Sequence, residues 1–342
     1  MHEGGKIEVL PLFPVGDKDD LSMAYTPGVA RVCTAIANDE RLADEYTIRK
    51  NTVAIVSDGT AVLGLGDIGP KAAMPVMEGK ALLFKEFGDV DAFPICLDVS
   101  TPQEIIETVV RLAPTFGGIN LEDIAAPGAF EVEAALKELL DIPVFHDDQH
   151  GTAVVALAGV VNALKLVKKD IADTRFVVAG MGAAGIAVGK ILLEAGAGHI
   201  VGLDRAGAVY DGRDGLNSAK QWFAENTNQD RQTGSAGEVL KGSDVFLGLS
   251  GPGLITADDV RTMNNRSRSS SPCPTPTRRL LPETGQGLVA VMATGRSDYP
   301  NQIKTSWRFP GSSDGALDAR PANISEGMKL AATPPSPTRY PR

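Results

Sequence analysis

The chain has 342 residues, which is enough for two ordinary domains. Its 33 Lys and Arg against 43 Asp and Glu give a net charge of −10, which argues against nucleic acid or an anionic membrane as a partner. Cys33, Cys96 and Cys273 lack disulfide or metal-type spacing, so we expect a reducing cytoplasm. The longest apolar stretch, residues 151–164, is expected to be too short to span a bilayer, and the N-terminus shows no signal peptide.

Short apolar runs rich in β-branched residues alternate with amphipathic stretches in the first half of the chain. The apolar runs predict buried strands of a parallel sheet at residues 52–59, 90–98 and 142–148. The amphipathic stretches predict helices at residues 101–116 and 127–141. Alternation of this kind predicts an N-terminal α/β catalytic domain, which we assign to residues 1–155.

Residues 151–169 form a helical pattern that ends in "KLVKKD", a basic end typical of a helix C-terminus. Next, residues 175–207 read as strand, glycine turn, helix and strand. This order predicts a C-terminal Rossmann-like, doubly wound dinucleotide-binding domain over residues 156–342. Residues 243–253 are predicted to form a later strand whose loop, with Ser250, lies beside the cofactor.

The glycine turn has the spacing G-x-G-x-x-G directly after a predicted strand and at the start of a predicted helix, which indicates a pyrophosphate site. The predicted cofactor residues of this turn are Gly180, Met181, Gly182, Ala183, Ala184 and Gly185. Asp204 ends the next strand and is expected to bind the ribose 2′-hydroxyl, which favours NAD, although Arg205 could instead bind the 2′-phosphate of NADP. The alternative is a glycine turn that serves packing alone.

Four carboxylates lie in two pairs at the ends of apolar segments: Glu122 with Asp123, and Asp147 with Asp148. Clustered carboxylates repel unless a cation neutralises them, and hard oxygen ligands suit Mg²⁺ or Mn²⁺. Either pair alone could equally be the first turn of a helix. No set of residues has zinc spacing, so we expect His146 and His150 to be local hydrogen-bonding residues.

Several long motifs resemble the compact bacterial malic enzymes, from about Gly4 to near the end of the chain. They are "AYTPGVA" at 24–30, "SDGTAVLGLGDIGPKAAMPVMEGKALLFKEFGDVDAFPICLD" at 57–98, "NLEDIAAPGAF" at 120–130, "PVFHDDQHGTAVVALAG" at 143–159 and "VMATGRSDYPNQI" at 291–303. The resemblance implies oxidative decarboxylation of L-malate to pyruvate and CO2, reduction of NAD or NADP, dependence on a divalent metal, and a homodimer.

The resemblance also implies a role for each matching residue. Tyr25 corresponds to the general acid, Lys80 to the general base, and Asp147 to the acid that supports the lysine. The implied metal ligands are Glu122, Asp123 and Asp148. A lysine acts as a base only if its pKa is lowered, which burial beside a cation would do.

Without the resemblance, Tyr25 would be interpreted as a core tyrosine and Lys80 as a solvated helix lysine. Lys71 is a further basic candidate near the substrate carboxylate. Larger malic enzymes have an arginine at the position of Ala61, so this chain is expected to bind the substrate carboxylate in another way.

Three stretches depart from the family pattern: residues 266–279, 304–308 and 333–342. As written, the first is a Ser/Pro/Arg-rich linker. With suitable codons, one shifted frame turns residues 269–276 into Val-Phe-Ala-Met-Pro-Asn-Pro, and it also restores family-like segments in the other two. We therefore hypothesise that these stretches are out-of-frame readings. The alternative function is a catalytically impaired NAD-binding pseudoenzyme, or the product of a frameshifted malic enzyme gene.

Overall fold

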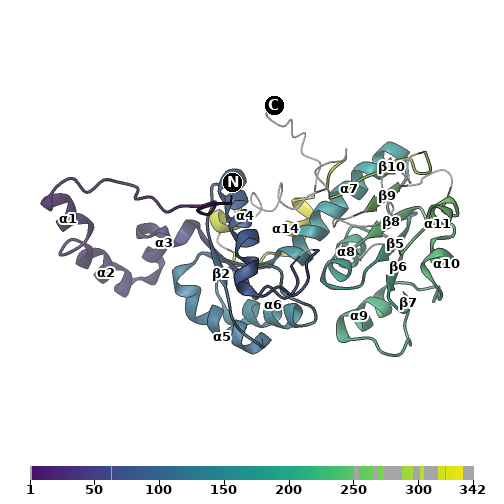
Figure 1. Ribbon diagram of the computed structural model, residues 1–342, viewed down its shortest axis with the longest axis horizontal. Coiled ribbons are helices and arrows are strands. Elements are labelled where there is room, and N and C mark those ends of the chain that lie inside the picture. Colours follow the sequence, from purple (N-terminus) through teal and green to yellow (C-terminus); the bar gives the residue numbers. More distant parts are fainter. Residues whose placement is uncertain are drawn as a thin grey trace.

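The computed structural model describes residues 2–62, 64–249, 254–264, 269–272, 287–295, 301–303, 315–319 and 321–333. These residues form an N-terminal arm and two α/β units, as Figure 1 shows. The α/β class and the order of a first domain followed by a Rossmann-like domain, both predicted from the sequence, are confirmed.

The arm comprises the residues before the first strand. Its helical segments are α1 (Lys18–Ala24), α2 (Val29–Asn38), η1 (Glu40–Leu42), α3 (Ala43–Tyr46) and η2 (Ile48–Asn51). None of these five segments buries a single residue. Figure 1 shows α1 and α2 projecting from the side of the first unit, so the arm has no core of its own. Helices this short are marginal in water unless they pack against another surface.

The first unit is built on a parallel sheet with the strand order β2-β1-β3-β4. Its elements are β1 (Thr52–Ser57), α4 (Pro70–Gly88), β2 (Asp91–Cys96), α5 (Pro102–Leu112), η3 (Ala113–Thr115), β3 (Gly118–Leu121), α6 (Gly128–Leu139) and β4 (Val144–His146). The predicted strands and helices of this half are confirmed. Helix α5 begins where the sequence requires, because Thr101 and Glu104 form a capping box and Pro102 takes the first turn.

The two units are joined by one long helical segment. A π-helical turn, η4 (Asp147–Gly151), continues directly into α7 (Thr152–Val167). Together they span 21 residues and are, by length and composition only, long and apolar enough to cross a membrane, so the helix extends beyond the apolar stretch 151–164 on which the length prediction was based. Half of that window is buried inside the structure, and Ala153 and Leu157 belong to the core of the second unit. The segment therefore packs as a core helix does.

The described strands of the second unit form a sheet in the order β10-β9-β8-β5-β6-β7, in which only the β6–β7 pairing is antiparallel. In chain order its elements are β5 (Arg175–Ala179), α8 (Ala183–Glu194), β6 (His199–Asp204), β7 (Gly207–Val209), α9 (Ser218–Asn226), α10 (Ala236–Leu240), β8 (Val245–Gly248), α11 (Ala257–Arg261), β9 (Ser269–Pro272) and β10 (Val291–Met292). Strands β5 and β8 are parallel neighbours, and the order in which successive strands are added to the sheet reverses between them, which is the switch point of a doubly wound sheet.

Strand β9 falls within the first aberrant stretch. Its sequence is Ser-Ser-Ser-Pro, yet its backbone lies between β8 and β10, with Pro272 opposite Gly248. Interior strands of parallel sheets are normally β-branched, and proline there removes a ladder donor. Residues 266–268, 273–279, 304–308 and 334–342 lie outside the described residues, so the hypothesis of shifted frames stays a prediction.

The chain returns to the first unit near its end. Residues 315–319 are helical, and α14 (Glu326–Ala331) follows. Leu317 and Ile324 pack with Val53 and Phe84 in a core cluster of the first sheet. Leu317 and Ile324 therefore belong to the first unit by packing, whereas Leu330 and Ala332 pack against the core of the second unit. The division into residues 1–155 and 156–342 stays a prediction.

Candidate active site

The four predicted carboxylates lie at the carboxyl ends of two neighbouring strands. Glu122 and Asp123 directly follow β3, and Asp147 and Asp148 open the π-turn η4 after β4. Because β3 and β4 are paired and parallel, these ends meet at one edge of the sheet. The alternative of a helix first turn does not apply to the first pair, since α6 begins only at Gly128.

Lys80 reaches this edge from helix α4. Its Nζ lies 2.5 Å from Oδ2 of Asp147 and 3.0 Å from Oε1 of Glu122. Asn120 donates a hydrogen bond of 3.0 Å to the other oxygen of Glu122. The lysine is only 9% exposed, so it is not the solvated helix lysine that its position alone suggested.

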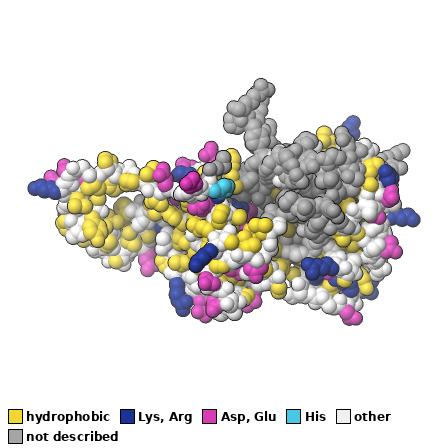
Figure 2. Space-filling model, viewed as in Figure 1, with side chains coloured by type: hydrophobic (Ala, Val, Ile, Leu, Met, Phe, Trp, Pro, Cys, Tyr) yellow, Lys and Arg dark blue, Asp and Glu magenta, His cyan; other side chains and the backbone are white. Residues whose placement is uncertain are grey.

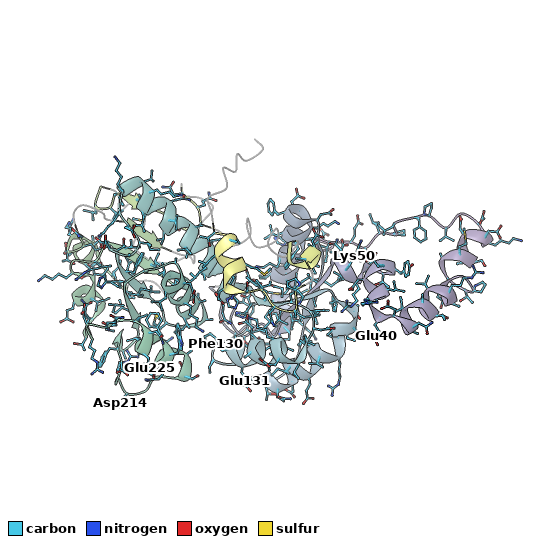
Figure 3. All side chains as sticks on the ribbon, turned by 180° about the vertical axis from the view of Figure 1, so that it is seen from behind. Glu40, Lys50, Phe130, Glu131, Asp214 and Glu225 are labelled. Atoms are coloured by element: carbon cyan, nitrogen blue, oxygen red, sulfur yellow. The ribbon has the colours of Figure 1, made fainter. Side chains whose placement is uncertain are left out.

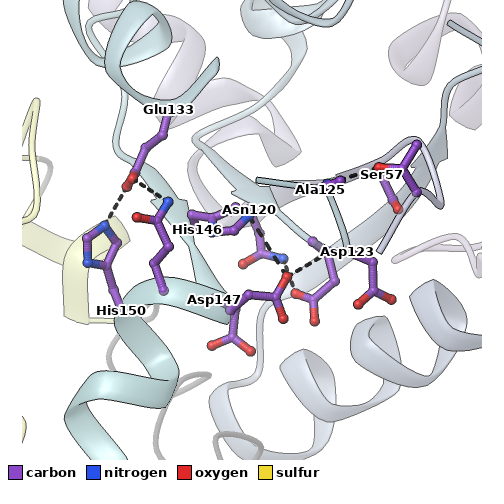
Figure 4. A network of polar contacts seen from close by, with 12 residues as sticks. Ser57, Asn120, Asp123, Ala125, Glu133, His146, Asp147 and His150 are labelled. Atoms are coloured by element: carbon purple, nitrogen blue, oxygen red, sulfur yellow. Dashed lines mark hydrogen bonds and ion pairs between the residues drawn. The ribbon is translucent and has the colours of Figure 1, made fainter. Parts of the chain in front are cut away.

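Three of the carboxylates converge. Oxygen atoms of Glu122, Asp123 and Asp148 all lie within 4.8 Å of one another. Figure 4 shows Asp123 and Asp147 at this edge beside Asn120 and His146. Hard oxygen ligands at this spacing fit a divalent cation such as Mg²⁺ or Mn²⁺.

The loop after β3 is held in an uncommon conformation. Asp123 has φ +53°, a left-handed value that L-residues other than Asn and Asp rarely adopt. Its backbone N–H donates to Oδ2 of Asp148 at 2.9 Å, and its carbonyl accepts from the N–H of Ala61 at 2.9 Å. These two bonds fix the backbone that carries the first pair of acids against the second pair.

The charges of this cluster do not cancel. Glu122, Asp123, Asp147 and Asp148 contribute −4 and Lys80 contributes +1, which leaves −3. Burial raises the pKa of Glu122 well above its usual value against the opposing effect of Lys80, and the neighbouring carboxylates raise it further. Burial likewise raises the pKa of Asp148. A divalent cation would relieve both penalties, so the residues present fit the predicted metal.

The pKa of Lys80 runs opposite to the expectation for a base. Burial lowers it, but the charges and hydrogen bonds of Asp147 and Glu122 outweigh burial, and the net effect raises the pKa above its usual value. This describes the cluster without a metal, where Lys80 is its only described cationic partner. A cation that takes over Glu122 would remove part of the effect.

The two predicted hydrogen-bonding histidines differ. His150 bonds Glu133 at 2.6 Å through Nε2 and Lys329 at 2.9 Å through Nδ1, as predicted. His146 is fully buried, and neither ring nitrogen has a hydrogen-bond partner among the described residues, so that prediction is wrong. Its nearest ionic neighbour is Oδ2 of Asp148 at 3.9 Å.

Tyr25 is not brought to the cluster by its own chain. It ends helix α1 and is 69% exposed, so the interpretation as a core tyrosine is wrong as well. Figure 1 places α1 at the far end of the arm, away from α4 and the first sheet. Lys71 lies in the exposed first turn of α4. Ala61, in contrast, lines the cleft described below.

The glycine turn between β5 and α8 has the predicted local geometry. Gly180 has φ +105°, which makes the tight turn. A Cβ on Gly185 would lie 2.0 Å from the Gly180 carbonyl, so helix and strand could not pack this closely around any other residue. A Cβ on Gly182 would meet nothing within 4 Å, so this position faces open space.

The side chains around this turn divide between core and cleft. Met181 is buried, and its side chain belongs to the core of the second unit, although it also borders the cleft. Ala183 and Ala184 open helix α8 and line the cleft. Ser250 lies outside the described residues.

Asp204 ends β6 as predicted, but two cations that the sequence reasoning missed already bind it. Arg213 donates to both of its oxygens, at 2.9 and 2.5 Å, and Lys220 donates to Oδ2 at 2.6 Å. The N–H of Ala206 gives Oδ1 a further bond of 3.0 Å. Burial raises the pKa of Asp204, but these contacts outweigh it and hold the pKa well below its usual value. The only signal in the sequence was a basic residue on each side of the turn at residues 214–215, namely Arg213 and Lys220.

One cleft connects the two predicted sites. It has a volume of about 1100 Å³ and opens between the two units. Asp148 and Ala61 of the first unit line it, and so do Gly180, Gly182 and Asp204 of the second unit. A ligand lying across the glycine turn would therefore have one end beside the carboxylate cluster.

Comparisons with known proteins agree with this geometry. Residues 4–104 match the family model for the malic enzyme N-terminal domain, and residues 149–276 match that for the malic enzyme NAD binding domain. The chain is 59% identical over 332 residues to an NAD-dependent malic enzyme of Geobacillus stearothermophilus, covering 97% of this chain and 69% of that protein. It is 46% identical to an NADP-dependent malic enzyme of Halomonas elongata, covering 96% and 78%.

Solved structures give the same result. The crystal structure of an NAD-dependent malic enzyme from Thermotoga maritima superposes with a TM-score of 0.92 at 45% identity, covering 97% of this chain and 89% of that one. The malic enzyme of Pyrococcus horikoshii superposes with a TM-score of 0.91 at 46% identity, covering 96% and 78%.

Proposed function

Because the chain belongs to the malic enzyme family, we propose that it oxidatively decarboxylates L-malate to pyruvate and CO2 with reduction of NAD or NADP. The observation that carries this proposal is the single cleft that runs from Asp148 to the glycine turn and Asp204. A hydroxy acid held at the carboxylate cluster would lie beside the nicotinamide end of a bound dinucleotide.

Glu122, Asp123 and Asp148 would hold the divalent ion, because they supply three converging oxygen ligands. Bound Mg²⁺ or Mn²⁺ would supply Lewis-acid stabilisation of the negative charge that develops as CO2 leaves. Lys80 takes the proton of the malate hydroxyl as the hydride leaves C2, and Asp147 orients the lysine through their 2.5 Å contact. Tyr25 then delivers a proton to the methylene carbon of enolpyruvate.

This last role requires a second copy of the chain. Tyr25 lies on an arm whose helices bury no residue and which exposes a run of large apolar side chains: Val9, Leu10, Leu12, Phe13, Val15, Leu21 and Met23. Figure 2 shows the apolar side chains over the arm. A surface of this kind is typical of an interface, and identical chains pair most often as twofold dimers. We infer a homodimer in which the arm brings Tyr25 to the partner's carboxylate cluster.

Complementation tests this arrangement. Tyr25→Phe and Lys80→Met would each be inactive as homodimers. Co-expressed with different tags, they would form mixed dimers that contain one site with both side chains intact. Random pairing would then recover about a quarter of wild-type activity if Tyr25 acts across the dimer. No recovery from purified mixed dimers would place Tyr25 in its own protomer's site and contradict the exchange.

The reaction itself is tested with the full chain, L-malate, Mn²⁺ and either NAD or NADP. We expect NAD(P)H and pyruvate in equal amounts, loss of turnover with a chelator, and recovery when Mn²⁺ is added back. A folded protein that binds the nucleotide without turnover would instead support the impaired pseudoenzyme. We propose the cytoplasm as its compartment, since Cys33 and Cys96 are both free thiols.

A further inference from the structure

A second group of charged side chains lies directly behind the carboxylate cluster, and the proposed chemistry does not use it. Its centre is Glu133 on helix α6, which is only 6% exposed. One carboxylate oxygen accepts from Lys137 and from Nε2 of His150, both at 2.6 Å. The other accepts from the Gln149 amide at 3.0 Å. A buried carboxylate with three partners is a fixed anchor, not a solvated surface acid.

The anchored residues belong to the turn that carries two of the active-site acids. Gln149 and His150 directly follow Asp147 and Asp148 in the five-residue π-turn η4. Figure 4 shows Glu133 and His150 on one side of this turn and Asp147 and Asp123 on the other. The turn is thus held from behind by Glu133, while its front presents the metal ligand and the partner of Lys80.

The contacts also determine which ring nitrogen of His150 carries the hydrogen. Lys329 of α14 can only donate, so Nδ1 of His150 accepts and Nε2 carries the hydrogen that Glu133 accepts. Burial works to raise the pKa of Glu133, but His150 and Lys137 outweigh it and lower the pKa to about 2. The anchor is therefore an anion, and its bonds to the turn are charge-assisted.

A π-turn needs such support. π-Helical turns are rare and occur mostly as single turns at functional sites, where the extra residue rotates side chains out of the α-helical register. Relaxation of η4 to an α-helical register would turn Asp147 away from Lys80 and Asp148 away from Glu122. Buried side-chain contacts on Gln149 and His150 oppose this relaxation.

We propose that Glu133 is a positioning residue that holds the π-turn in the register that presents Asp148 to the metal and Asp147 to Lys80. The proposal rests on the metal site of the proposed function. Outer partners that orient metal ligands are typically worth 10- to 100-fold in metal affinity. Glu133 would act indirectly, because it contacts Gln149 and His150, which directly follow the metal ligand Asp148 in the chain.

The test compares Glu133→Gln with Glu131→Gln, the same substitution on an exposed residue of the same helix. Mn²⁺ affinity is measured by electron paramagnetic resonance, NAD affinity by fluorescence, and folding by thermal denaturation. We expect Glu133→Gln to weaken Mn²⁺ binding roughly 10- to 100-fold while NAD affinity stays within about twofold, and Glu131→Gln to leave both unchanged. Gln149→Met, which removes a single amide contact, should weaken Mn²⁺ binding in the same direction by a smaller factor.

Wild-type Mn²⁺ affinity in folded Glu133→Gln would overturn the proposal, and so would an equal loss of NAD and Mn²⁺ affinity, which indicates a general structural role. If Glu133→Gln does not fold, wild-type Mn²⁺ affinity in Gln149→Met decides against the proposal. Failure of the wild-type chain to bind Mn²⁺ would overturn the metal site of the proposed function itself, and the positioning role with it. The two failures are thus distinguishable.

Discussion

The carboxyl edges of the two sheets differ in what they present to a ligand: the first presents charged side chains, and the second presents backbone. At the first sheet the edge gathers side chains, since four carboxylates and Lys80 crowd together with a net charge of −3. At the second sheet the turn after β5 lacks side chains, since Gly182 faces open space and Gly185 lets helix and strand backbones pack closely. A bound cation would stabilise the carboxylates of the first edge, whereas the second edge offers the N-terminus of α8 to an anion.

The two edges therefore tolerate different kinds of substitution. The first edge depends on particular functional groups, so a change that preserves shape but removes charge should abolish its function. The second edge depends on the absence of side-chain atoms, so the addition of a single methyl group should be enough to impair nucleotide binding. Because the two edges line one cleft, each can be tested with the other as the internal control.

The largest expected effect is at the first edge. Lys80→Met should lower kcat by roughly 10²- to 10⁴-fold, because it removes the proposed proton acceptor. The substitution also removes the only described cation within the four carboxylates, so Mn²⁺ binding should persist or tighten. Steady-state kinetics and Mn²⁺ titration measure both. Lys85→Met on the exposed face of the same helix is the control, and a comparable kcat in the two variants would remove Lys80 from the chemistry.

At the second edge, two glycines should fail in different ways. Gly185→Val would place Cβ 2.0 Å from the Gly180 carbonyl, so the turn must distort and the melting temperature should fall together with NAD affinity. Gly182→Ala has room, so it should fold normally and yet weaken NAD binding, because the methyl group occupies the approach to the backbone. Mn²⁺ affinity should survive in Gly182→Ala. Unchanged NAD affinity there would mean that the nucleotide does not cross this turn.

The support behind the first edge should show in the pH dependence of stability. Glu133 has a folded pKa of about 2 against a usual value of 4.5. A lowered pKa contributes stability that is complete above pH 4.5 and is lost as the pH falls toward 2. Urea unfolding should therefore find Glu133→Gln less stable than wild type by roughly 3 kcal/mol at pH 7 and by about 1 kcal/mol at pH 3. A difference that does not change with pH would show that the anchor is not charged.

The smallest effect concerns the choice of coenzyme. The second unit's lining of the cleft carries Arg205, Arg213 and Lys220 against Asp204 and Asp214, so three positive and two negative charges leave +1. Lys220→Ala removes that excess and also removes one of the two donors to Oδ2 of Asp204, the other being Arg213, so this oxygen can accept from a ribose hydroxyl. The ratio of kcat/KM for NADP to that for NAD should fall about 5- to 10-fold, close to 1 kcal/mol. Lys241→Ala, on an exposed lysine of the same unit, is the control. An unchanged ratio would mean that Lys220 does not sense the 2′ position.

Periodicity and turn chemistry predicted the regular parts of the fold. The strands at 52–57 and 175–179 and the glycine turn were visible because their residues carry the signal locally. The arm was not predicted, since its helices are short and bury nothing. The full length of the apolar helix was not predicted because η4 and α7 continue one another without a break.

The site divides in the same way. The carboxylates were predictable because each pair follows a strand, but their meeting with Lys80 spans 67 residues of chain and depends on strand order. Arg213 and Glu133 were missed because an isolated arginine or a glutamate within a helical pattern carries no signal of its own. Their roles exist only through partners brought close by the fold.

The return of the chain to the first unit limits how the molecule can move. The units are connected once through η4 and α7 and a second time through the segment that places Leu317 in the first core. Because two separate stretches of chain connect the units, rotation about the line between these connections can open or close the cleft. Rotation about other axes is resisted. For the same reason the first unit is not a contiguous piece of gene, and a fragment that stops at residue 155 would leave the site of Leu317 as a hole in its core.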